Sequence, residues 1–123
     1  MVFVIEQRNI FLSGNFTDTR NDIEFLHKLL TRNGFDVCMK INDEGPTAED
    51  MIENCDLFFA VVGDQEGAIK IGNRTLPQIE MDFAINYHRP SIAMLKHPDR
   101  PGVSPNQESL RQLVCDRFGH KLI

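Results

Sequence analysis

Glu80 lies on the apolar side of a predicted helix, where an acidic side chain is unusual. Thr75 is suited to cap this helix, Gln78 follows at the capping-box spacing, and Pro77 fits only in a first turn. The apolar positions that recur around the acid are Leu76, Ile79, Phe83 and Ala84. The helix dipole favours the charged carboxylate by roughly 0.3–1 kcal/mol, whereas apolar neighbours raise its pKa by desolvation. Such a carboxylate can act as a nucleophile or balance positive charge, or it can lean out to water at the edge of the apolar stripe.

Polar and flexible residues that follow two predicted strands form a second set of candidates. The residues proposed for ligand binding are Ser13, Gly14, Asn15, Phe16, Asp18, Gly63 and Arg74. Asp18 either contacts a ribose hydroxyl or caps the next helix, and Arg74 either meets a phosphate or carboxylate or is solvated. Gly14 either lets the backbone approach a ligand or forms a simple turn. Neither G-x-G-x-x-G nor G-x-x-x-x-G-K occurs, so this region is neither a dinucleotide fingerprint nor a phosphate loop.

The composition is that of an ordinary soluble domain. The 123 residues are 41% hydrophobic and 25% charged, with a formal charge of −5 and no basic stripe, which argues against nucleic acid binding. No apolar run reaches membrane-spanning length, and we expect neither a signal peptide nor a membrane partner. Cys38, Cys55 and Cys115 are too few for a disulfide scaffold and lack zinc-finger spacing, so we expect no metal and a cytoplasmic setting.

Strand-like and helix-like segments alternate along the chain, which predicts one α/β domain over residues 1–123. The expected strands are Asn9–Ser13, Phe35–Met39, Asp56–Val62, Ser91–Leu95 and Lys121–Ile123. Thr19 and Asp22 offer a capping box for the first helix, and a twelve-residue loop, Gly63–Arg74, leads into the Glu80 helix. Met1–Ile5 is a further apolar run that polar residues separate from the first strand, and we interpret it as a loosely attached arm.

This alternation predicts a flavodoxin-like three-layer sandwich, whose central parallel sheet has five strands in the order 2-1-3-4-5. Ligands of such sheets bind beyond the carboxyl ends of the strands, at the point where the strand order reverses. Here that point lies between the first and third strands. It brings the Gly14–Asp18 segment, the Gly63–Arg74 loop and the start of the Glu80 helix to one rim. The sequence therefore predicts a small-molecule site on that rim.

Four segments between residues 9 and 97 resemble TIR-like domains. Ile10–Asp18 is similar to the strand and loop that open that fold, and Asn54–Gly63 to its run of cysteine, aspartate, apolar strand and glycine. Thr75–Ala84 resembles the glutamate helix of the family, with Pro77 as a departure. Arg89–Pro90, before an apolar strand, corresponds to the family's lysine and proline.

The same pattern is similar, more loosely, to nucleoside 2-deoxyribosyltransferases, in which the glutamate of a D-x-G-T-x-x-E motif is the nucleophile. Glu80 aligns with that glutamate, whereas Arg74, Leu76 and Pro77 stand where the aspartate, glycine and threonine would be. Catalytic TIR domains use a glutamate of the corresponding helix to cleave NAD. The resemblance therefore implies cleavage of an N-glycosidic bond, with Glu80 as the catalytic carboxylate.

The resemblance also implies partners. A nucleoside or nucleotide is the expected ligand, NAD would be a substrate and not a cofactor, and no cofactor is expected. Both families complete their sites across subunits, which implies a homo-oligomer. The alternative function is a non-catalytic TIR-like signalling or nucleotide-sensing module that acts by self-association.

Overall fold

The computed structural model describes residues 9–14, 19–39, 47–63, 70–71, 74–96, 104–118 and 121–122. Four parallel strands within these ranges form a sheet in the order β2-β1-β3-β6. They are β1 (Asn9–Ser13), β2 (Asp36–Cys38), β3 (Leu57–Val62) and β6 (Ser91–Leu95). This confirms the predicted α/β class and the strand order 2-1-3-4. Beyond β6, the two residues of β7 (Lys121–Leu122) lie in parallel register with the end of β6, and a complete fifth strand stays a prediction.

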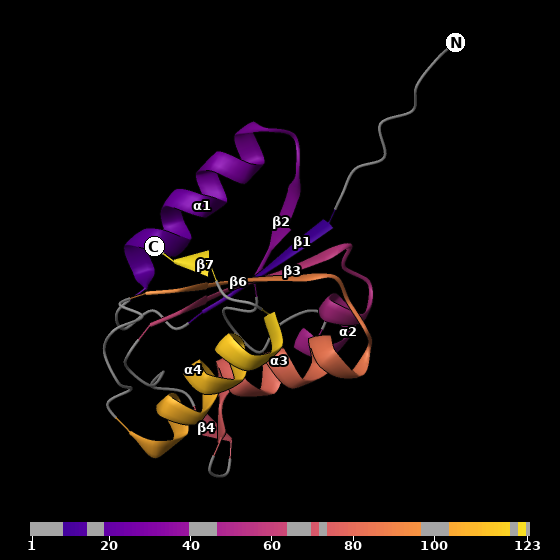
Figure 1. Cartoon of the computed structure of the whole chain (residues 1–123). Coiled ribbons are helices and arrows are strands. Elements are labelled where there is room, and N and C mark those ends of the chain that lie inside the picture. Colours follow the sequence, from indigo (N-terminus) through magenta and orange to yellow (C-terminus); the bar gives the residue numbers. More distant parts are fainter. Residues whose placement is uncertain are drawn as a thin grey trace.

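Helices cover the two faces of the sheet unequally (Figure 1). One face carries α1 (Arg20–Arg32), and the other carries α2 (Ala48–Glu53), α3 (Leu76–Asn86) and α4 (Pro105–Phe118). The three-layer arrangement follows from the parallel strands, because each crossover places its helix on one face of the sheet. None of the described helices is long and apolar enough to cross a membrane.

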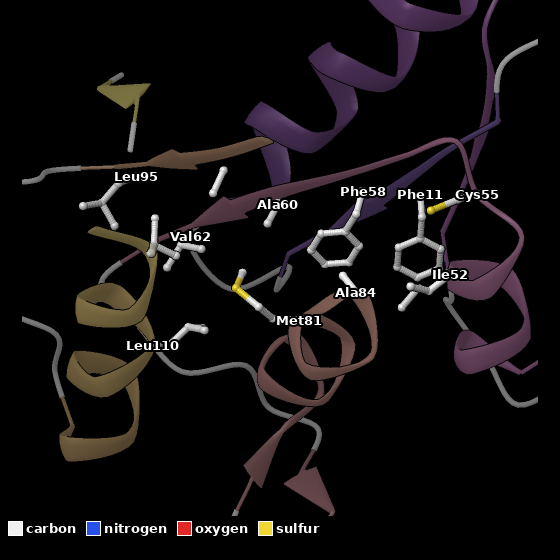
Figure 2. Packing of buried hydrophobic residues seen from close by; sticks show 12 residues of the cluster. Phe11, Ile52, Cys55, Phe58, Ala60, Val62, Met81, Ala84, Leu95 and Leu110 are labelled. Carbon is white, nitrogen blue, oxygen red and sulfur yellow. The ribbon is translucent and has the colours of Figure 1, made fainter. Parts of the chain in front are cut away.

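The larger hydrophobic cluster lies between the sheet and α2, α3 and α4. Phe11 of β1 and Phe58 of β3 stack with their ring centroids 5.9 Å apart. Met81 and Ala84 reach from α3 towards these strands, as Figure 2 shows. The cluster on the α1 face is smaller, and its buried members are Ile10, Leu12, Ile23, Phe59 and Val61. The packing of Met81 and Ala84 fixes α3 against the centre of the sheet, and with it the position of Glu80.

The start of α3 is as predicted. Thr75 Oγ1 accepts a hydrogen bond from the Gln78 backbone N–H (3.4 Å), and Gln78 Oε1 accepts one from the Thr75 backbone N–H (2.9 Å). This reciprocal pair confirms the capping box, and Pro77 lies in the first turn. The predicted buried face of α3 was wrong for three of its four apolar residues. The buried residues of α3 are Glu80, Met81 and Ala84, whereas Leu76, Ile79 and Phe83 are half-buried.

Two further predictions about the connections were wrong. Thr19 makes no side-chain capping bond at the start of α1, because its side chain is fully buried against the end of β1. The expected loop Gly63–Arg74 includes a short antiparallel pair, β4 (Lys70–Ile71) and β5 (Arg74–Thr75). These strands of two residues are too short to leave an alternating pattern in the sequence. The second strand, β5, ends at Thr75, which is also the residue that caps α3.

Candidate functional site

The structure brings Ser13 and Glu80 together at the carboxyl end of β1. Ser13 is the last residue of β1 and pairs in register with Ala60 of β3, so it lies where the strand order reverses. Its hydroxyl donates a 2.7 Å hydrogen bond to Glu80 Oε1. Both side chains are buried, and Glu80 is only 3% exposed. Two of the predicted site residues thus form one buried pair on the expected rim.

Burial raises the pKa of Glu80 from its ordinary value of 4.5 to about 7, although the hydrogen bond from Ser13 lowers it. Within the described ranges, no cation forms an ion pair with this carboxylate. Glu80 is therefore not a solvated residue at the edge of the helix face. It also forms no salt bridge with any described residue. A carboxylate near neutral pKa in apolar surroundings is typical of a group that exchanges protons or meets a positive centre.

Gly14 directly follows Ser13, and its missing side chain makes room for the packing around it. A Cβ at this position would lie 2.6 Å from Ile23 Cδ1, 3.0 Å from the Val61 carbonyl oxygen and 3.2 Å from Thr19 Oγ1. Contacts this short show that α1 and β3 close directly over Gly14. Of the two interpretations made from the sequence, the geometry favours a tight connection between β1 and α1.

Gly63, predicted to bind a ligand, has its carbonyl oxygen occupied by two buried side chains of α4. Gln107 Nε2 donates to it at 2.7 Å and Arg111 Nη1 at 2.9 Å. Arg111 Nη1 also donates to the Lys96 carbonyl oxygen at 2.9 Å, so α4 ties together the chain ends after β3 and β6. Lys96 in turn forms a 2.8 Å ion pair with Asp22 in the first turn of α1. These contacts hold the rim around the Ser13–Glu80 pair.

None of Gln107, Arg111 and Lys96 was predicted from the sequence. The buried positions of α4 include Leu110 and Val114, and Arg111 lies beside Leu110 in the sequence. An arginine next to an apolar position usually lies at the edge of a helix face, with its charged end in water. The spacing offered one clue. Gln107 and Arg111 are four residues apart, and residues at this spacing lie on the same side of a helix.

Four further residues were predicted to bind a ligand. Asn15, Phe16 and Asp18 lie outside the described residues, as does the side chain of Arg74, whose backbone belongs to β5. Their roles stay predictions.

Two thiols, half-buried Cys38 and buried Cys55, are poor candidates for an alternative nucleophile. Burial, together with nearby Cys55 and Asp36, raises the pKa of the Cys38 thiol to about 11. Burial also raises the pKa of the Cys55 thiol, although the Arg89 guanidinium acts in the opposite direction. Both thiols are therefore protonated at neutral pH, and the thiol is the unreactive form. In the part of the chain that the structure describes, no three His, Cys, Asp or Glu side chains gather as metal ligands would.

An open groove with a volume of about 610 Å³ lies away from this site, at the amino end of the sheet. We call it the amino-end groove. Asp56 and Pro90, which line it, directly precede β3 and β6, whereas Ser13 and Glu80 lie at the carboxyl end of β1. Among the described residues that line it, most are apolar: Ile10, Leu30, Phe35, Leu57, Phe59 and Ile92. The groove is therefore separate from the Ser13–Glu80 pair.

Comparison with solved structures gives a likeness that extends over most of the chain. No family model matches the chain, and no curated protein sequence matches it. Among solved structures, the chain is similar to a CMP N-glycosidase from Clostridium botulinum, BcmB, with a TM-score of 0.55 and 20% sequence identity. The likeness covers 94% of this chain and 88% of that chain. At this identity it establishes a common fold, and the resemblance to TIR-like domains has no support from a family model or a sequence match.

Proposed function

We propose that this domain cleaves the N-glycosidic bond of a nucleoside or nucleotide, with Glu80 as the catalytic carboxylate. The observation that carries the proposal is the buried Ser13–Glu80 pair at the carboxyl end of β1. A fold shared with a CMP N-glycosidase supports the same class of bond, and so does the sequence resemblance to nucleoside 2-deoxyribosyltransferases.

The chemistry needs a negative oxygen close to the sugar. When the bond between the anomeric carbon and the base nitrogen breaks, its electron pair leaves with the base, which takes up a proton. Positive charge then develops on the anomeric carbon and the ring oxygen. The Glu80 carboxylate lowers this barrier by bonding to the anomeric carbon or by balancing its charge. Water then gives its hydroxyl to the anomeric carbon and releases a proton; where Glu80 has bonded to that carbon, this bond breaks and the carboxylate is regenerated. The products are the free base and the sugar or sugar phosphate.

Ser13 has a positioning role in this scheme. Its hydroxyl binds Oε1 of Glu80 and so fixes the orientation of the carboxylate. Since Ser13 binds Oε1, we assign the other carboxylate oxygen, Oε2, to the sugar. Because only the ionised carboxylate works, and burial raises its pKa to about 7, the rate should increase as the pH rises through about 7.

The proposal is tested by incubating the protein with CMP, other nucleoside monophosphates, nucleosides and NAD, and separating the products by chromatography. Glu80→Gln keeps the shape of the side chain and its acceptor for Ser13 but removes the charge. We expect it to lower turnover by at least about 100-fold while ligand binding is retained. Glu53→Gln, an exposed glutamate of α2, is the matched control and should leave turnover unchanged.

Two outcomes would contradict the catalytic assignment. If Glu80→Gln cleaves these compounds as fast as the parent, Glu80 is not the catalytic residue. If the parent cleaves none of them but a nucleotide still raises its melting temperature, the domain is a nucleotide-sensing module, which is the alternative function.

Self-association is part of the same proposal. A second subunit would complete the enclosure of a ligand beside the Ser13–Glu80 pair, as the resemblance to both families implies. The contact is expected near the Gly63–Arg74 loop or the Pro98–Pro105 loop, most of which lies outside the described residues. Light scattering should give the mass of a dimer or a larger species. A monomer at high protein concentration, with and without nucleotide, would contradict this part.

A further inference from the structure

The α1 face of the sheet carries apolar side chains that α1 does not cover. Ile92 lies in β6, which pairs with the central strand β3, yet 40% of it is exposed. Phe59 of β3 and Ile92 both line the amino-end groove. A strand flanked by parallel neighbours is usually covered on both faces, because its crossover connections place helices there. The groove is therefore an apolar surface of the sheet that still lacks a covering element among the described residues.

The groove opens where the chain enters β1. The parallel strands β1, β3 and β6 all begin at this end of the sheet. The Asn9 backbone N–H donates to Asp56 Oδ2, and the Asp56 backbone N–H donates to the Asn9 carbonyl oxygen, both at 2.8 Å. Asp56 is itself a residue of the groove wall. The described chain therefore enters β1 beside a residue of the groove wall.

We propose that Met1–Ile5, the apolar arm of the same chain, covers the amino-end groove. The arm lies outside the described residues, and its side chains are uncharged, with one methionine, two valines, a phenylalanine and an isoleucine. Glu6, Gln7 and Arg8 join it to β1. Docking of such an apolar run is favourable, because apolar surface of both the arm and the groove wall leaves water. This inference is independent of the proposed function.

The connection is long enough for this docking. Three residues span at most about 10 Å, and the distance from β1 across β3 to β6 is two strand spacings, which is also about 10 Å. Attachment through so short a linker gives the arm an effective concentration on the order of millimolar at the groove. The arm therefore meets the groove of its own chain more readily than a second copy does at ordinary protein concentrations.

A double-mutant cycle tests the proposal through the melting temperature of the full chain. Val4→Glu places a charge in the arm, and Ile92→Glu places one in the floor of the groove, at a half-exposed position that tolerates it. Each change should lower the melting temperature by about 3–8 °C, and the double variant should lower it scarcely further. Phe25→Glu is the control, because Phe25 is 64% exposed on α1 and does not line the groove, so its effect should add to that of Val4→Glu.

The cycle is measured over a 100-fold range of protein concentration, together with nuclear Overhauser contacts between the methyl groups of Val4 and Ile92. Contacts between these methyls and a concentration-independent coupling support the arm of the same chain. A coupling that disappears on dilution overturns the proposal in favour of a second copy. Additive effects of Val4→Glu and Ile92→Glu, or no effect of Val4→Glu, also overturn it.

Discussion

Replacing Glu80 with glutamine should stabilise the fold at neutral and alkaline pH and have little effect in acid. Burial raises the pKa of the carboxyl group from 4.5 to about 7 in the folded chain. Between these values the unfolded chain has released the proton that the folded chain still holds, so the free energy of unfolding falls as the pH rises. At roughly 1.4 kcal/mol for each pKa unit, the parent loses about 3 kcal/mol between pH 4 and pH 8. The glutamine variant has no proton to lose and avoids this cost.

Urea unfolding of both proteins from pH 4 to pH 8 measures this effect. Glutamine keeps an oxygen that accepts the Ser13 hydrogen bond, so the two proteins differ mainly in the charge. Effects of all other titrating groups cancel in the difference between them. The variant's advantage should be near zero at pH 4 and about 3 kcal/mol at pH 8. Glu53→Gln, on the exposed side of α2, controls for the removal of one negative charge from an acidic protein.

A difference that stays constant between pH 5 and pH 8 would refute the reasoning, because it would mean that the folded carboxyl titrates as it does in the unfolded chain. A variant that is less stable than the parent at pH 8 would refute it too. That result would require a favourable partner for the charged form that outweighs the cost of burial. A gain in stability together with a loss of turnover is the pattern expected of a functional residue that the fold tolerates at a cost.

Three further changes have clear expected effects. Ser13→Ala removes the hydrogen bond that lowers the pKa of Glu80, so a carbon-13 NMR titration of the Glu80 carboxyl should show a higher midpoint; an unchanged midpoint would contradict the 2.7 Å contact. Gly14→Ala should cost about 1–3 kcal/mol in urea unfolding, because its Cβ would lie 3.0 Å from a backbone carbonyl oxygen of β3; a neutral change would show that the connection can widen. Arg111→Met should cost about 1–3 kcal/mol in the same assay, since the carbonyl groups of Gly63 and of the residue after β6 lose a buried donor; an unchanged stability would mean that other donors replace it.

The start of α3 could be predicted from the sequence because its determinants are local. Thr75, Pro77 and Gln78 lie within four residues and satisfy each other's backbone groups without help from the rest of the chain. The strand order also followed from a general rule on parallel connections, which depends little on particular residues. Together these two predictions were sufficient to bring Ser13 and Glu80 to the same rim.

The contacts that hold the rim could not be predicted because they join distant parts of the chain. Arg111 and Gly63 are 48 residues apart, and nothing near Arg111 indicates that its guanidinium binds two carbonyl oxygens of the sheet. The role of Gly14 likewise depends on how closely α1 and β3 approach it. The sequence left open whether Glu80 is buried or leans out to water, for a related reason. Helical spacing gives the direction of a side chain, whereas the depth of burial depends on what packs above it.

The Ser13–Glu80 hydrogen bond joins residues 67 positions apart, and this separation has a consequence for folding. Contacts between distant residues form after the intervening loops have closed, so the pair can form only when β1 has paired with β3 and α3 has docked. Until then the carboxyl is solvated and loses its proton above about pH 4.5. At pH 6, Glu80 should therefore take up about one proton as the chain folds, and Glu80→Gln should lack this uptake. A pH-indicator dye in weak buffer would follow this uptake during refolding and so report the moment at which the site closes.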